Sequence, residues 1–372
     1  MHTKICEMLE IEYPILGFTP SPEVAAAISR AGGLGVLGAV RYSDPDELAR
    51  DLDWMDAHVD GKPYGLDIVM PQKFVGDDDL QNLEHMVPEE HKAFIEGVLQ
   101  RHGVPPLPEG QNSPSAITGW MHSVARRQVE LAYERPGVKL LANALGSPPK
   151  DIIDECHEHG ILVAALAGKP KHAASHVAAG VDIIVAVGHE AGGHTGEVTT
   201  MVLVPEIVDA VGDTPVLAAG GIGTGRQVAA SFALGAEGVW LGSVWLTAEE
   251  YRLEPPTESG HSVVKHKLLE ATSSDTVRSR VISGKPARML RTPWTEAWED
   301  KGSPGTLPMP LQGILVADAE ARIRKVQNPE LLGTPVGQIV GQMNEVVPVE
   351  TIIKRLVDGF RDATARMIKV RG

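Results

Sequence analysis

The stretch "IIVAVGHEAGGHTGEVTTMVLVPEIVDAVGDTPVLAAGGIGTGRQVAASFALGAEGVWL", residues 183–241, decides the fold. It contains three short apolar runs, at Ile183–Val187, Val216–Ala219 and Gly238–Leu241. The helical patterns "VPEIVDAV" and "GRQVAASFALG" lie between these runs. Short apolar strands that alternate with helices are typical of βα units in a parallel sheet.

The same rhythm extends toward the N-terminus. Five further runs read as strands: Ile15–Phe18, Leu34–Leu37, Leu66–Met70, Lys139–Ala142 and Ile161–Ala165. Helical patterns such as "PEVAAAISRAG", "DPDELARDLDWM", "PPKDIIDECHEHG" and "KHAASHVAAG" follow most of them, and several end in Gly, a common helix stop. Eight βα units predict an α/β protein with one (β/α)₈ TIM-barrel domain over residues 1–372, whose function lies on the loops after the strands.

Two regions interrupt the rhythm. Residues 72–135 are far longer than a βα loop, so we predict an insertion after the third strand with its own helices. It is either a lid at the C-terminal rim of the barrel or a helical excursion on the outside. Residues 248–345 follow the last strand and predict a C-terminal extension with a helix near Lys265–Thr272. An amphipathic helix from Val349 to about Ile368 closes the chain.

The composition limits the possible partners and location. The net charge is −15 and no dense Lys/Arg cluster occurs, which disfavours nucleic acid and anionic membranes. Two cysteines are too few for a disulfide framework. The start "MHTKICEMLEIEYP" lacks the apolar core of a secretory signal, and no apolar run approaches the ~18 residues of a membrane span. We therefore expect a cytoplasmic protein without nucleic-acid or membrane partners, with a homodimer left open.

The motif "GHEAGGHTGE" at 188–197 resembles a zinc motif only superficially. H-E-x-x-H requires two histidines four residues apart on a helix. His189 and His194 are five apart, and Gly192 and Gly193 between them would break a helix. The other candidate, "CHEH" at 156–159, lies on a helix that leads into a strand, at the opposite end of the barrel from the expected site. We predict no metal site.

Two glycine-rich turns follow adjacent strands and suit a phosphate. "AAGGIGTGRQVAA" after the seventh strand contributes Gly220, Gly221, Gly223 and Gly225. "GVWLGSVWLTAEE" after the eighth contributes Gly242 and Ser243. Glycines allow close approach of backbone N–H groups to an anion, and phosphate at the loops after strands 7 and 8 recurs in TIM barrels. A phosphate-bearing ligand is therefore predicted.

His194 follows the glycines of the loop after the sixth strand, on the same rim. A histidine in this place can act as a base, an acid or a hydrogen-bond donor near neutral pH. The alternative is a polar side chain that only ties the loop down.

At this point a resemblance becomes visible. "VAVGHEAGGHTGEVTTMVLVPEIVDAVGDTPVLAAGGIGTGRQVAASFALGAEGVWLGSVWL" closely resembles the nitronate monooxygenase family, formerly called 2-nitropropane dioxygenases. FMN-dependent enoyl-acyl-carrier-protein reductases share the signature. The likeness extends to "YPILGFTPSPEVAAAISRAGGLGVLG", "TSSDTVRSRVISGKPARMLR" and "GTPVGQIVGQMNEVVPVETIIKRL", and it covers most of the chain except 72–135.

The resemblance implies a barrel that binds FMN and a role for particular residues. His194 corresponds to the catalytic histidine near the reactive face of the flavin. The residues implied in cofactor binding fall into three sets: Gly17, Phe18, Gly192 and Gly193 along the ring; Gly220, Gly221, Gly242 and Ser243 at the phosphate; and Lys169 near the pyrimidine side, with Gln338 in the C-terminal "GQ" motif. A cation near the pyrimidine would stabilise anionic reduced flavin.

The chain departs from the family pattern at three places that border flavin and substrate. "GFTPSP" follows the first strand, where many members have Met-Ala-Gly or a similar run. Asp67 stands where Asn is frequent, and Val187 stands where Asp or Gln is frequent. These departures leave the substrate open, whereas FMN is expected from the resemblance.

The resemblance implies two reactions. In the first, a nitronate passes electrons through FMN to O₂ and yields a carbonyl compound and nitrite, with His194 bound to the nitro oxygens or acting as base on a neutral nitroalkane. In the second, NAD(P)H reduces the flavin, which then reduces an enoyl thioester or quinone. A non-catalytic barrel that binds FMN or another phosphate without turnover is the third alternative.

Overall fold

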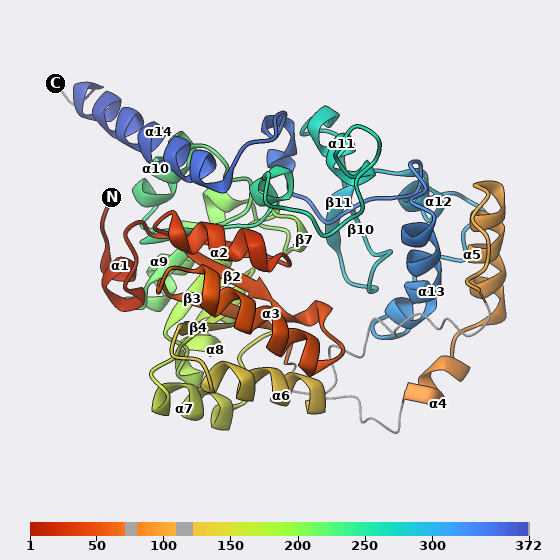
Figure 1. Cartoon of the computed structure of the whole chain (residues 1–372), viewed down its shortest axis with the longest axis horizontal. Coiled ribbons are helices and arrows are strands. Elements are labelled where there is room, and N and C mark those ends of the chain that lie inside the picture. Colours follow the sequence, from red (N-terminus) through yellow and green to blue (C-terminus); the bar gives the residue numbers. More distant parts are fainter. Residues whose placement is uncertain (71–79, 109–121, 371–372) are drawn as a thin grey trace.

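The computed structural model describes residues 1–70, 80–108 and 122–370, and it contains a closed eight-stranded parallel barrel (Figure 1). The strands run in the order β1-β2-β3-β4-β5-β6-β8-β9. Their bounds are Ile15–Thr19, Leu34–Gly38, Tyr64–Ile68, Val138–Asn143, Leu162–Ala167, Ile183–Val187, Val216–Ala219 and Gly238–Leu241. The predicted (β/α)₈ barrel is confirmed, with the third strand beginning and ending two residues earlier than expected.

Alternation along each strand separates two apolar layers. In β6, Val185 faces the barrel interior, whereas Ile184 and Ala186 pack in the layer between the strands and the helices. Helix α1 (Lys4–Leu9) adds Ile5 and Leu9 to the interior cluster. Because strands buried on both faces cannot carry polar side chains cheaply, they read as the continuous apolar runs seen in the sequence.

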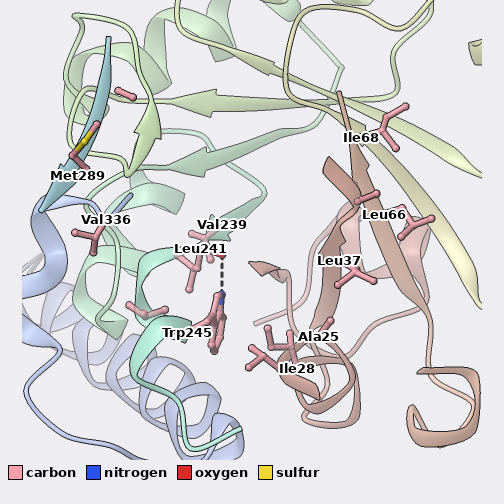
Figure 2. Close-up of a cluster of buried hydrophobic side chains, with 14 of the residues drawn as sticks. Ala25, Ile28, Leu37, Leu66, Ile68, Val239, Leu241, Trp245, Met289 and Val336 are labelled. Atoms are coloured by element: carbon pink, nitrogen blue, oxygen red, sulfur yellow. Dashed lines mark hydrogen bonds between the residues drawn. The ribbon is translucent and has the colours of Figure 1, made fainter. Parts of the chain in front are cut away.

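Helices cover the outside of the barrel. They are α2 (Pro22–Arg30), α3 (Pro45–His58), α6 (His122–Tyr133), α7 (Lys150–Glu158), α8 (Pro170–Ala179), α9 (Thr200–Val211) and α10 (Gly225–Ala233), with short 3₁₀ turns η1 (Ala39–Arg41) and η4 (Ser243–Thr247). Figure 2 shows Trp245 of η4 between β9 and the α2 residues Ala25 and Ile28, with its indole N–H donated to the Leu241 carbonyl at 2.8 Å.

The insertion after β3 contains two helices that stand away from the barrel and one helix that packs on it. Residues 71–79 and 109–121 lie outside the described residues. Helices α4 (Leu80–His85) and α5 (Glu89–Arg101) stand away from the barrel, whereas α6 packs on α3, β3 and β4 as a barrel helix (Figure 1). The region expected as one insertion to residue 135 therefore ends in an ordinary βα helix.

Helix α5 packs against the C-terminal extension. Its partner is α13 (Leu311–Lys325), whose Arg322 binds Glu96 at 2.7 Å and the Pro105 carbonyl at 2.9 Å. Phe94 meets Trp298 edge to face, with 5.0 Å between the ring centroids. Two segments that interrupt the barrel pattern thus lie side by side.

The extension also contains elements that the sequence pattern did not predict. Strands β10 (Thr276–Ser279) and β11 (Ala287–Leu290) form an antiparallel pair, and the short β7 (Gly193–His194) adds to β11 as a third strand. The remaining elements are α11 (Val263–Glu270), α12 (Pro293–Ala297), η5 (Gln338–Gln342) and α14 (Val349–Val370). Of these, α11 and α14 confirm the helices predicted near Lys265–Thr272 and from Val349 to about Ile368. No helix in the described part of the chain is long and apolar enough to cross a membrane.

Candidate functional site

The loop after β6 is shaped by contacts that only glycine allows. A Cβ on Gly188 would lie 2.0 Å from the Thr200 hydroxyl oxygen, so a larger residue would displace the start of α9. The Glu190 carboxylate accepts from the Thr200 amide at 2.9 Å and from its hydroxyl at 3.0 Å. Glu190 therefore caps α9 and fixes the loop.

The C-terminal extension holds the tip of this loop. In the β7–β11 ladder, Gly193 pairs with Arg288 and His194 pairs with Ala287. The guanidinium of Arg288, which is 4% exposed, donates to the His189 carbonyl at 3.1 Å and to the Thr276 hydroxyl at 3.1 Å. The position of His194 thus depends on a hairpin about ninety residues further along the chain.

The two ring nitrogens of His194 have different environments. Its Nε2 lies 2.6 Å from the Ser283 hydroxyl oxygen, which also accepts from the Lys285 amide at 3.3 Å. No bonded partner of Nδ1 is found among the described residues. The side chain is exposed, yet the surrounding protein and the Lys285 charge lower the pKa of His194 below its ordinary value. A neutral imidazole at neutral pH follows, with one nitrogen free for a ligand.

The turn after β8 contains two glycines in left-handed backbone. Gly220 and Gly221 both adopt positive φ, 106° and 69°, which a residue with a side chain rarely does. The amides of Gly223 and Thr224 donate to the Gln227 side chain at 3.0 Å each, in a capping box at the start of α10. Those two amides are therefore bonded within the protein and are not available to a ligand.

The turn after β9 lies beside it, because β8 and β9 are neighbours with Ala219 paired to Trp240. Ser243 begins η4, so its amide has no partner inside that turn. Its hydroxyl accepts from the Gly337 amide at 2.8 Å. The next amide, of Gln338, donates to the Glu190 carbonyl at 2.9 Å, so η5 joins the β9 turn to the histidine loop.

Phe18 and Gly17 face opposite sides of the barrel wall. Phe18 stacks with Trp240 at 6.4 Å between centroids and packs at the barrel interior. A Cβ on Gly17 would lie 2.9 Å from the Trp245 ring and 2.4 Å from Ile28, so Gly17 is required for packing of the outer layer. Its backbone alone is available to a ligand.

The other glycines and Lys169 differ in surroundings. A Cβ on Gly192 would lie 2.8 Å from the Val336 backbone, whereas Gly193, at φ 75°, has open space beside it. Lys169 is exposed and lies at the N-cap position of α8 without a capping hydrogen bond. The neighbouring Gly168 lies against the histidine loop, where a Cβ would approach Gly196 to 3.5 Å. The structure thus brings Lys169 to the same rim.

The residues of the two excluded metal motifs make hydrogen bonds or packing contacts instead. His189 binds the Gly196 carbonyl at 3.3 Å and so braces its own loop. Cys156 is buried with its sulfur 3.9 Å from the Tyr133 hydroxyl. Among residues 1–70, 80–108 and 122–370, no group of three His, Cys, Asp or Glu side chains is arranged to hold a metal.

Sequence reasoning missed Ser283 and Arg288. Both lie in "RSRVISGKPARMLR", a segment that the sequence marks only through its resemblance to the family. In "PARML", Arg288 stands among apolar residues, which suggests that its side chain is buried against a polar partner. Nothing in the local sequence indicates that this partner lies in the histidine loop, about ninety residues earlier.

Comparison with known proteins gives a consistent picture. A model of the nitronate monooxygenase family matches residues 2–359. A Mycobacterium tuberculosis protein named "Putative monooxygenase Rv1533" is 48% identical, over 99% of this chain and 98% of its own. A Staphylococcus saprophyticus protein named "Probable nitronate monooxygenase" is 32% identical, over 77% of this chain and 78% of its own.

Solved structures agree with the fold. FabK from Thermotoga maritima superposes with a TM-score of 0.74 at 29% identity, covering 100% of this chain and 99% of that one. A nitroalkane oxidase from Streptomyces ansochromogenes superposes with a TM-score of 0.77 at 22% identity, covering 98% and 99%, and shows the fold. The family match spans nearly the whole barrel, its histidine loop and its C-terminal hairpin. The chain belongs to the nitronate monooxygenase family and is an oxidoreductase.

Proposed function

We propose that this chain is an FMN-dependent oxidoreductase that oxidises alkyl nitronates with O₂ to a carbonyl compound and nitrite. The observation that carries the proposal is the placement of His194. The β7–β11 ladder and Ser283 hold the imidazole on the rim of the barrel with Nδ1 free. The same rim carries the two turns suited to a phosphate.

The residues present fit FMN at both ends of the molecule. Gly220 and Gly221, in left-handed backbone, and Gly242 and Ser243 on the neighbouring strand would hold the phosphate through amide N–H groups. The four residues at the ring would be Gly17, Phe18, Gly192 and Gly193; of these, Gly193 has open space beside it, and Gly17 and Gly192 would contribute backbone only. The Lys169 ammonium, exposed and without a bonded partner among the described residues, would face the pyrimidine side, and Gln338 lies between the two loops.

The bound flavin would supply the electron acceptor, which no side chain of the protein can replace. With its proton on Nδ1, His194 would donate to an oxygen of the nitronate; with its proton on Nε2, donated to Ser283, its bare Nδ1 would take the α-proton of a neutral nitroalkane. Because the pKa of His194 is lowered, the ring is already neutral at physiological pH and able to accept that proton.

Replacement of the imidazole tests this role. His194→Asn should lower kcat/KM for a neutral nitroalkane by about 10²–10⁴, the usual worth of a general base, and should lower kcat/KM for the pre-formed nitronate much less. Nitrite release and O₂ uptake measure both. Equal losses on the two substrates would exclude the base role, and His189→Asn, which removes only the brace to Gly196, serves as the control.

A second candidate is an NAD(P)H-dependent flavin reductase that acts on an enoyl thioester or quinone. The observation in its favour is the similarity to FabK over the whole chain. His194 would then position or protonate the acceptor. Turnover of NADH or NADPH by the FMN-loaded protein, with enoyl thioester or quinone as acceptor, would support this reaction.

We also propose that the helices of the insertion, together with α13, cover one side of the barrel mouth. The Arg322–Glu96 ion pair, with 2.7 Å between nitrogen and oxygen, links α13 to α5. This link supports the proposal because it holds the two helices together as one unit.

A further inference from the structure

The β10–β11 hairpin beside His194 holds a concentration of positive charge. Arg278 on β10 stands directly opposite Arg288 on β11 in the strand register. Like charges that face each other across two strands destabilise a sheet. The turn between the strands, residues 280–286, adds two more cations, Arg280 and Lys285. The hairpin therefore keeps four positive charges together at a cost in stability.

The carboxylates of the adjacent histidine loop do not neutralise these charges. Glu190 is committed to the start of α9. Glu197, with a side chain that is 82% exposed, lies 3.8 Å from the Arg278 guanidinium, and an exposed pair of this kind contributes little. Arg280 and Lys285 have no ion-pair partner within residues 1–70, 80–108 and 122–370. The hairpin thus carries an excess of positive charge.

This excess acts on two neighbouring groups. Burial and the Arg278 charge lower the pKa of Arg288. The surrounding protein and the Lys285 charge lower the pKa of His194. In each case a nearby cation disfavours a second positive charge. An anion bound beside the hairpin would relieve both repulsions.

The turn brings its two cations to the residue that holds His194. The Ser283 hydroxyl oxygen lies 2.6 Å from Nε2 of His194 and accepts from the Lys285 amide at 3.3 Å. The Arg280 guanidinium donates to the carbonyl of Gly284 at 2.9 Å. Both Arg280 and Lys285 are exposed. Their charges therefore flank Ser283 and remain open to an incoming ligand.

The charge of the hairpin is opposite in sign to that of the whole chain. With a net charge of −15, the chain as a whole repels an anion. Salt screens charges that are separated by more than about 10 Å at 0.1 M ionic strength, so the nearest charges count most for a substrate at the barrel mouth. A cleft lined by charge of one sign raises the local concentration of a substrate of the other sign.

We propose that the turn of the β10–β11 hairpin attracts anionic substrates to His194 and makes the site selective for a nitronate over the neutral nitroalkane with the same carbon skeleton. Arg280 and Lys285 supply the charge. They act on the encounter with the substrate and on its binding, before the chemical step. This inference rests on the proposed function, and it assigns specificity to two residues that do not touch the reacting atoms.

The sign of the salt dependence tests the proposal on the wild-type chain. Salt weakens attraction, so kcat/KM of the FMN-loaded protein for propyl-2-nitronate should fall about three- to tenfold between roughly 20 mM and 500 mM ionic strength. The constant for 2-nitropropane, which carries no charge, should change little. A nitronate constant that rises with salt, or does not change, would overturn the proposal, because the net charge of the chain would then prevail.

The double variant Arg280→Gln/Lys285→Gln removes the charge and keeps polar side chains of similar length. It is compared at about pH 8.5, where His194 is neutral with or without Lys285. At low ionic strength its kcat/KM for the nitronate should be at least about fivefold lower, through a higher KM with little change in kcat. The fall with salt should disappear or reverse.

The matched control Lys62→Gln/Lys139→Gln removes the same number of charges at the other end of the barrel. Lys62 is exposed just before β3, and Lys139 lies near the start of β4. This variant should keep both the nitronate constant and its salt dependence. Equal losses in the two double variants would assign the effect to net charge and would overturn the role of the turn.

Nitrite, the anionic product, provides a measurement that does not depend on turnover. Its Kd for the FMN-loaded protein, followed by flavin absorbance, should rise with ionic strength and be higher in Arg280→Gln/Lys285→Gln. If this pattern is found while propyl-2-nitronate is not oxidised, the proposed function fails and the attraction of anions stands. If the nitronate is oxidised without salt dependence, only this inference fails. Absence of both nitronate oxidation and nitrite binding would overturn both.

Discussion

His194 depends on two neighbours that fix its direction and its charge. Ser283 is bonded to Nε2, and Nδ1 has no bonded partner among the described residues. Lys285 and the surrounding protein lower the pKa of the ring, which keeps it neutral over a wider range of pH. Both residues come from the hairpin turn of the extension and not from the barrel.

The Lys285 charge gives a prediction with a definite sign. A nearby cation disfavours imidazolium, so Lys285→Gln should raise the pKa of His194. The base is active when neutral, so the acid limb of the kcat/KM profile for a neutral nitroalkane should move to higher pH. Lys301→Gln, on the exposed loop after α12, is the control. An unmoved limb, or one displaced to lower pH, would contradict the role given to Lys285.

At the scale of elements, the site is built from a barrel loop and a distant hairpin. Strand β11 pairs with His194 and so links it to the extension. The Arg288 guanidinium donates to the His189 carbonyl and to the Thr276 hydroxyl. The extension therefore holds the tip of the loop, in addition to the Glu190 and His189 contacts made within the loop itself.

Arg288→Met tests this dependence. Loss of two buried hydrogen bonds, with the His189 carbonyl left unpaired, should lower the free energy of unfolding by about 2–4 kcal/mol. Nitronate oxidation should fall at least about tenfold, because a small misplacement of a reacting group is costly. Urea unfolding and nitrite release are the measurements.

The exposed Arg324, at 71% side-chain exposure, provides the control Arg324→Met, which should change neither quantity appreciably. Full activity in a destabilised Arg288→Met chain would show that the hairpin does not position the histidine.

The barrel was predictable because its information is local. Each strand is a short apolar run and most helices carry their own stop, so eight units could be counted from the sequence. The β7–β11 pairing was not predictable, since β7 is only two residues long and its partner lies about ninety positions away. For the site, His194 and the phosphate turns were chosen by motif. Only the structure shows that Gly17 is packed against Trp245 and Ile28. Only the structure shows that the Gly223 amide already donates to the Gln227 side chain.

At the scale of the whole molecule, the extension returns to the barrel in two places. Its hairpin reaches the histidine loop, and α14 packs along α10, the helix that follows the glycine-rich turn after β8. Close contact between α10 and α14 relies on Gly225 and Gly359, whose backbones meet: a Cβ on Gly225 would lie 2.2 Å from the Phe360 nitrogen.

Gly225→Ala should therefore force the two helices apart. Backbone atoms cannot yield as a flexible side chain does, so we expect a loss of about 1–3 kcal/mol or more in the free energy of unfolding. Gly97→Ala is the matched control: it lies within α5 with only the Arg101 guanidinium nearby, at 3.7 Å, and should stabilise by roughly 0.5–1 kcal/mol. Thermal or urea unfolding compares the two. Equal stability of both variants would refute the tight contact.

The central claim is that this barrel passes electrons from a nitronate to a bound flavin. The most direct test mixes the FMN-loaded protein anaerobically with propyl-2-nitronate in one syringe and with NADH or NADPH in another, and follows the flavin absorbance. We predict rapid bleaching by the nitronate and none by either nicotinamide on the same time scale. Bleaching by NADH or NADPH with no response to the nitronate would contradict the account and assign the chain to the reductases.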